Sequence, residues 1–196
     1  MLKRWLTKPV TWVAVVLLGL GGAVGLYWFQ PWRLFTDTTV TEALSTPAPS
    51  AAGTRAGEPA ESAPSAAEPA ESAPRAAEPA EPVVVRTGSF ITHEHATAGT
   101  ARLVRNPDGS HQVELVGLDT SNGPDLRVWL TDQEVKKGSA GWRVFDDGEW
   151  TELGRLKGNR GDQVYPVPGN IDPGDYRSIS IWCKRFAVSF GAASLR

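Results

Sequence analysis

An uncharged apolar run, Pro9–Phe29, constrains this chain more than any other feature of its sequence. As a helix rising about 1.5 Å per residue, the run is roughly 32 Å long, enough to cross the hydrocarbon core of a bilayer. The basic residues Lys3, Arg4 and Lys8 precede it, which favours an N-terminus kept in the cytoplasm. Residues 1–35 are therefore predicted to be a single-pass anchor in the lipid bilayer of the cell membrane, with the rest of the chain outside the cytoplasm.

A cleaved signal peptide is the alternative to an anchor. Small residues are expected after the apolar core of a signal peptide, whereas aromatic residues occupy the end of this run and the positions just after it, as is typical of a membrane interface. They are Tyr27, Trp28, Phe29, Trp32 and Phe35. The sequence favours the uncleaved signal-anchor. A Gly21-x-x-x-Gly25 spacing would let two such helices approach closely, although glycine is common in membrane helices in any case.

Residues 36–82 are predicted to be a disordered spacer rich in Ala, Pro and Glu. The decamer Glu58–Ala67 returns as Glu68–Ala77 with Arg75 in the place of Ser65, and the segment carries a net charge of −6. This composition buries too little apolar surface to offset the loss of chain entropy on folding. We expect it to act as a tether that holds the following domain away from the membrane.

Residues 83–196 are predicted to form one all-β domain, a β-sandwich or a barrel-like fold. Alternating strand-like runs at 101–105 and 112–116 flank the turn sequence of residues 106–109, the pattern of a hairpin. No stretch shows a capped helical period, and short strands at this spacing are typical of sandwiches and barrels. The domain has no net charge, so nothing in it indicates nucleic-acid binding, which needs a basic face.

Further strands are expected in the second half of the domain. The turn sequence 122–125 introduces a strand with Leu126, Val128 and Leu130 on one face and Arg127, Trp129 and Thr131 on the other. Pro166 suits an edge strand. The long loop 132–149, with Trp142 and Phe145, is of the kind that shapes a binding surface.

The longest β-type run is Ser178–Phe190. Ile179, Ile181 and Cys183 share one strand parity, and Phe186, Val188 and Phe190 share the other. A regular strand cannot change its apolar face, so we predict a bulge or a change of sheet between Cys183 and Phe186.

Cys183 is the single cysteine of the chain and the redox candidate. One interpretation is a thiolate that performs redox chemistry or ligates a transition metal or haem iron, with a pKa lowered by Lys184 and Arg185 if these point the same way. The other is a small buried apolar side chain. A dithiol mechanism within one chain is excluded because there is no second cysteine.

His93 and His95 would lie on one face of a strand, roughly 7 Å apart, where a metal could bridge them. His95 is also a candidate axial ligand for haem. The alternative is two exposed polar residues near a strand end, and His111 is expected at the surface. Asp125 fixes a turn or binds a ligand. Residues 157–162 are interpreted as a turn, since they lack the spacing of a phosphate loop.

Several motifs resemble those of the DM-thirteen domain, the electron-transfer-like module of Skeletor-type proteins. They are His95-x-x-x-Gly99, Asn122-Gly123-Pro124-Asp125-Leu126, the run from Leu153 to Pro166, Ile181-Trp182-Cys183 and the run from Phe186 to Leu195. The resemblance implies an extracytoplasmic β-domain with a redox or electron-transfer function, its characteristic cysteine matched by Cys183. An anchor and a low-complexity spacer before the domain are also the layout of many bacterial members of that family.

We therefore expect a membrane-anchored accessory redox or electron-transfer module rather than a stand-alone enzyme. It would use Cys183 for redox chemistry, and His95 could help to bind a metal or haem. Its partner would be a membrane redox protein or an envelope protein. The alternative is a non-enzymatic binding module that depends on loop residues such as Trp142 or Trp150 and keeps Cys183 as core packing. A surface protein with a purely structural role is the third option.

Overall fold

A computed structural model describes residues 9–45 and 81–196 of the chain. Helix α1 (Pro9–Phe29) leads into the 3₁₀ helix η2 (Pro31–Phe35), and short 3₁₀ turns η3 (Gly138–Gly141) and η4 (Pro173–Asp175) occur later. The strands are β1 (Thr39–Thr41), β2 (Val83–Thr92), β3 (Thr97–Arg105), β4 (His111–Thr120), β5 (Leu126–Thr131), β6 (Trp150–Arg155), β7 (Arg160–Pro166), β8 (Ser178–Cys183) and β9 (Val188–Ser194).

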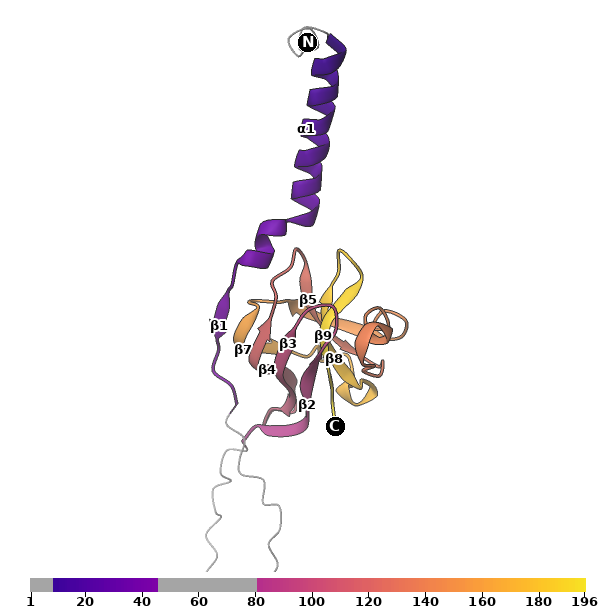
Figure 1. The fold of residues 1–196 in the computed structure, drawn as a ribbon. Coiled ribbons are helices and arrows are strands. Elements are labelled where there is room, and N and C mark those ends of the chain that lie inside the picture. Colours follow the sequence, from indigo (N-terminus) through magenta and orange to yellow (C-terminus); the bar gives the residue numbers. More distant parts are fainter. Residues whose placement is uncertain (1–8, 46–80) are drawn as a thin grey trace, which may run out of the picture.

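Helix α1 projects away from the strands, and none of its residues is buried (Figure 1). By length and composition the apolar segment Pro9–Arg33 is able to cross a membrane, and a signal sequence near an N-terminus would pass the same test. The helix itself is therefore as predicted, whereas its insertion in a membrane remains a prediction.

The strands of the described residues form one sheet in the order β1-β7-β4-β3-β2-β9-β8-β5-β6. Neighbours are antiparallel except β1 and β7. Strand β2 joins the two halves, because its residues 83–89 pair with β3 and its residues 90–92 pair with β9. The sheet curls into a half-barrel (Figure 1), and this confirms the predicted all-β fold.

Apolar side chains are buried on both faces of the curl. The larger cluster includes Val128 and Leu130, the face predicted for β5, together with Ile179 and Ile181 of β8. Trp129 on the opposite face of β5 is also buried, packed with Phe145, Trp182 and Ala192 in a second cluster. The loop 132–149 supplies Phe145, so this loop covers the outer face of the sheet rather than standing free of it.

The β3–β4 hairpin is confirmed. Arg105 pairs with His111, and the amide of Gly109 donates to the carbonyl of Asn106 within the turn, where Gly109 has φ 83°. Only glycine adopts such a left-handed conformation at little cost. The turn predicted at residues 157–162 is present only in part, because residues 156–159 form the link between β6 and β7 and residues 160–162 belong to β7.

The run Ser178–Phe190 is two strands rather than one, which corrects the predicted bulge or change of sheet. Strand β8 ends at Cys183 and β9 begins at Val188, and these two residues pair across a tight hairpin. The amide of Phe186 donates to the carbonyl of Cys183, and Ala187 has a left-handed φ of 49°. The apolar parity changes at this point because the chain reverses direction there.

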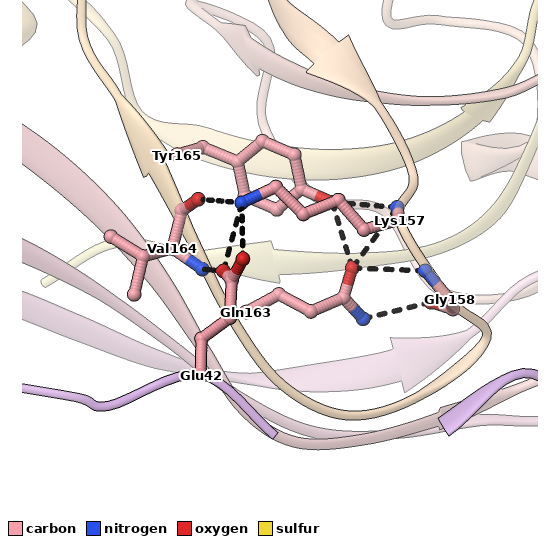
Figure 2. A network of polar contacts seen from close by, with 6 residues as sticks. All are labelled: Glu42, Lys157, Gly158, Gln163, Val164 and Tyr165. Carbon is pink, nitrogen blue, oxygen red and sulfur yellow. Dashed lines mark hydrogen bonds and ion pairs between the residues drawn. The ribbon is translucent and has the colours of Figure 1, made fainter. Parts of the chain in front are cut away.

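Residues 36–45 lie against the β-domain, although the sequence assigned them to the spacer. Strand β1 pairs in parallel with the outer edge of β7, Thr39 with Arg160 and Thr41 with Asp162. Beyond β1, the Glu42 carboxylate accepts hydrogen bonds from the Val164 amide at 2.6 Å and from Lys157 Nζ at 2.8 Å (Figure 2).

The position of β1 changes the connectivity expected of the spacer. Residues 46–80, which lie outside the described residues, link β1 to β2 within the domain. The direct connection between α1 and the domain is instead residues 30–38. The predicted role of the spacer as a tether between anchor and domain is therefore replaced by that of a connection between β1 and β2, which three strands separate in the sheet.

Candidate functional site

Cys183 lies in the main core. It is the last residue of β8, it pairs with Leu126 and Val188, and its exposed fraction is 0%. Burial raises the pKa of the thiol, while hydrogen bonds from the backbone amides of Phe186, Asp125 and Arg185 act in the opposite direction. The net effect keeps the thiol neutral at pH 7, which favours the buried structural interpretation over an exposed thiolate.

The two basic residues that follow the cysteine do not approach its sulfur. Lys184 Nζ lies 3.3 Å from Glu152 Oε2. The Arg185 guanidinium donates to the carbonyl oxygens of Tyr27 and Trp28 at the end of α1, and it sits over the Trp28 ring. The predicted lowering of the thiol pKa by these cations therefore has no structural basis.

His93 is buried between β9 and the loop 132–149. Its Nε2 lies 3.0 Å from the carbonyl oxygen of Lys136, which can only accept, so Nε2 carries the proton and donates. Its Nδ1 then accepts from the Ser189 hydroxyl at 2.9 Å. Burial lowers the pKa of His93. Both ring nitrogens are thus engaged in fastening the loop to the sheet.

His95 lies apart from these partners. Its ring packs on Phe190 with 3.9 Å between centroids, and its Nε2 is 3.8 Å from Glu94 Oε2. Desolvation lowers the pKa of His95, and the neighbouring Glu94 carboxylate partly opposes that shift. His93 packs instead against Phe145 at 5.6 Å. The two imidazoles therefore have different surroundings.

The described donors do not form a binding set for a transition-metal ion. Within residues 9–45 and 81–196 no group of three or more His, Cys, Asp or Glu side chains is arranged to hold a metal ion. His93 would have to give up two hydrogen bonds, and Cys183 would have to leave the core.

Asp125 serves as an ion-pair partner. Its Oδ1 lies 2.8 Å from Arg127 Nε, and Arg127 in turn binds Glu152 at 2.5 Å. The Asp125 carbonyl oxygen accepts from the Lys184 amide at 3.0 Å, so Asp125 also fixes the β8–β9 hairpin to the start of β5. Trp182 packs between Trp129 and Phe145 and is fully buried.

The predicted residues His95, Gly123 and Pro124 do come together, at a cavity that the sequence did not reveal. The helix-end cavity, about 270 Å³, lies between the end of α1 and the domain. Its other walls come from Phe29, Gln30, Pro31, Arg33, Glu94, Phe186 and Phe190. Phe29 stacks on Phe186 with 5.7 Å between ring centroids. The signal for this cavity in the sequence is the group of aromatic residues at the end of the apolar run, which the sequence alone places at the membrane interface.

Comparison with known protein families finds one that matches most of the domain. The family described as electron transfer DM13 matches residues 89–195. The matched segment contains every domain residue of the helix-end cavity and Cys183. No curated protein and no solved structure matches the chain.

Proposed function

Because this chain belongs to the electron transfer DM13 family, we propose that it is a membrane-anchored accessory domain of an electron-transfer system outside the cytoplasm. The observation that carries the proposal is the contact between the apolar helix and the family domain. An exposed 21-residue apolar helix is unstable in water and stable in a bilayer. At the end of this helix Phe29 stacks on Phe186 of the β8–β9 hairpin, and Arg185 of the hairpin donates to the carbonyl oxygen of Trp28.

The orientation of the helix follows from charge. Lys3, Arg4 and Lys8 precede the apolar segment, and cytoplasmic flanks of membrane helices carry the excess of basic residues. The domain then lies on the extracytoplasmic side, next to the membrane surface. Its partner in this proposal is a membrane redox or envelope protein, and the domain assists that partner rather than acting as an enzyme by itself.

In this proposal Cys183 is a core side chain. The completely buried sulfur and the raised thiol pKa support that role. A redox role is the second candidate, supported by the backbone hydrogen bonding of Phe186, Asp125 and Arg185, which lowers the pKa of the thiol against the larger effect of burial. The role of a binding module is the third, supported by Trp150, 39% exposed and stacked on Trp129 with 3.9 Å between centroids.

One complementation experiment tests the proposal. The full chain with a C-terminal tag is expressed in its source organism after deletion of the gene. The tagged chain should remain in the membranes during alkaline extraction and should keep its full mass. Protease should reach the tag only from outside the cell. Electron flow from NADH to ferricyanide in these membranes should fall on deletion and return with the wild-type chain. A released, cleaved chain or unchanged electron flow would contradict the proposal.

The variants Cys183→Ala and Trp150→Ala separate the three roles in the same assay. Cys183→Ala removes one buried atom, at a cost of about 1 kcal/mol in stability, and should restore electron flow if the thiol is structural. Loss of electron flow in a Cys183→Ala chain that is folded and present at normal levels would establish the redox role instead. Loss in Trp150→Ala alone would favour the binding module.

A further inference from the structure

A small polar hollow adjoins the helix-end cavity and shares Arg33 and Pro124 with it. It lies between residues 30–38 and the segments that precede β5 and follow β6, and its volume is about 100 Å³. We name it the arginine hollow. The charged and polar side chains that line it are Arg33, Thr38, Asn122, Asp125, Arg155 and Lys157. Three cations and one carboxylate line the hollow, so its charge favours an anionic ligand.

The carboxylate of the hollow belongs to an ion-pair group that is itself positive. Asp125 Oδ1 lies 2.8 Å from Arg127 Nε and 3.6 Å from Arg155 Nη2. Arg127 also pairs with Glu152, and Lys184 Nζ lies 3.3 Å from the same carboxylate. Three cations thus share two carboxylates, which leaves one positive charge in excess. Arg155 is the cation of this group that lines the hollow.

Two of the three lining cations are available to a ligand. Lys157 is not, because its Nζ donates to both oxygens of the Glu42 carboxylate at 2.8 Å (Figure 2). Arg33 is exposed, and its side chain makes no hydrogen bond or ion pair within residues 9–45 and 81–196. The Arg155 side chain is 69% exposed and only 3.6 Å from its carboxylate partner, and an exposed pair of this kind contributes little stability. Arg155 can therefore turn toward a ligand at small cost.

Guanidinium groups and the size of the hollow together favour a phosphate group. A guanidinium donates paired N–H bonds that match two oxygens of a phosphate. At roughly 30 Å³ for each water in the liquid, a hollow of about 100 Å³ admits one phosphate group but no large ligand. The Thr38 side chain lines the same hollow and supplies a hydroxyl donor.

The position of the hollow indicates a lipid as the source of that phosphate. Arg33 is the last residue of the apolar segment Pro9–Arg33, four positions after the end of α1. In an anchored chain these positions lie at the level of the lipid head groups. Basic side chains next to a membrane helix attract anionic lipids. This step rests on the proposed membrane anchoring.

We infer that the arginine hollow binds the phosphate of an anionic phospholipid, held between the guanidinium groups of Arg33 and Arg155. The lipid carries no cationic group on its head, because a choline or amine would lie against the two arginines. Its acyl chains stay in the bilayer. Binding fastens the start of β5 and the end of β6 to the membrane surface, as a second attachment beside the Phe29–Phe186 stack.

Calorimetric titration of the full chain in phosphatidylcholine nanodiscs tests this binding, with empty nanodiscs as the blank. The probes are dihexanoyl phosphatidylglycerol, dihexanoyl phosphatidylcholine and inorganic phosphate. The wild-type chain should bind the phosphatidylglycerol at least about tenfold more tightly than the phosphatidylcholine, the effect of two basic side chains at an anionic head group. Absence of phosphatidylglycerol binding, or equal binding of the two lipids, would overturn the inference. Inorganic phosphate that binds as tightly as phosphatidylglycerol would overturn the assignment to a lipid.

Two variants and a matched control locate the site. Arg33→Gln and Arg155→Gln should each weaken phosphatidylglycerol binding about fivefold, the equivalent of about 1 kcal/mol per basic side chain. Arg105→Gln lowers the net charge equally at an exposed residue outside the hollow, and it should leave the affinity unchanged. An equal loss in Arg105→Gln would show an effect of net charge alone and contradict the site. Unchanged affinity in the chain with both Arg33→Gln and Arg155→Gln would contradict it as well.

The outcome also separates this inference from the proposed function. A chain that is extracted from membranes as a cleaved soluble domain defeats both. A chain that stays anchored and restores electron flow, yet binds no phosphatidylglycerol as wild type, defeats the lipid site alone.

Discussion

Cys183 and His93 both lie below the surface, and burial acts on their ionisation in opposite directions. It raises the pKa of the thiol and lowers the pKa of the imidazole, so both side chains are neutral at pH 7. The sequence marks both as reactive residue types. Their chemistry in the fold depends on neighbours that come from elsewhere in the chain, such as Lys136 and Ser189 beside His93.

The buried His93 predicts a pH dependence of stability. Its folded pKa is lower than the unfolded value near 6.5, so the unfolded state takes up a proton first as the pH falls. The contribution of His93 is fully present above pH 6.5 and is lost as the pH drops below it, by at most about 1.4 kcal/mol per pH unit. Urea unfolding between pH 7 and pH 5 measures this slope.

Substitution of the histidines tests whether they cause this dependence of stability on pH. His93→Gln should flatten it, and adding His95→Gln should flatten it further, because the pKa of His95 is also lowered by desolvation. A slope that is the same in wild type and His93→Gln would show that His93 does not titrate in this way. Glu42 acts in a separate window: its pKa is lowered chiefly by the hydrogen bond from Lys157, so its contribution is lost only in more acidic solution.

At the scale of elements, β1 depends on groups outside itself. It has three residues and is too short to be stable without its neighbour β7, so the Glu42 contacts beside it matter. Gln163 supports the same corner from within: its Oε1 accepts from the Tyr165 hydroxyl at 2.7 Å, and its Nε2 donates to the Gly158 carbonyl at 2.8 Å (Figure 2). Burial raises the pKa of Tyr165 to about 12, so its hydroxyl remains a donor.

Glu42→Ala should loosen β1. It removes the acceptor of the Val164 amide and the partner of Lys157, and should lower the free energy of unfolding by about 1 kcal/mol. The ion pair is more than a third exposed on the Lys157 side, so it accounts for little of this loss. Hydrogen exchange should become faster at the Val164 amide. Glu134→Ala, which breaks the exposed pair with Arg177, is the control and should leave that exchange unchanged.

The sequence predicts those elements whose determining residues lie close together in the chain. The β3–β4 hairpin was predictable because its turn residues and flanking strands lie within a few positions of each other. The change of apolar face after Cys183 was visible, but a bulge and a hairpin turn both produce it, and pairing with Val188 decides between them. Strand β1 could not be predicted, because its stability depends on an edge some 120 residues away.

At the scale of the whole molecule, the candidate site is assembled from distant segments. Gln30 and Phe29 lie more than 60 residues before His95 and about 150 before Phe186 in the chain, and the curl of the sheet brings them together. The sequence identified His95, Gly123 and Pro124 as motif residues, but it offered no way to pair them with the end of the apolar helix. Only the fold shows that the two features form one cavity.

The course of the chain predicts that the domain stays beside the helix whatever the length of the spacer. Residues 46–80 join β1 to β2, so deletion of the repeat Glu68–Ala77 shortens a connection within the domain and leaves the 30–38 link untouched. Phe29→Cys and Phe186→Cys, introduced with Cys183→Ala, place two thiols where the rings now stack. A short bifunctional thiol reagent should join the two cysteines with the same yield in the full-length chain and in the chain that lacks the repeat, both in membranes. Single-cysteine chains provide the background. A yield that depends on the repeat would show that the spacer, and not β1, sets the distance between domain and membrane.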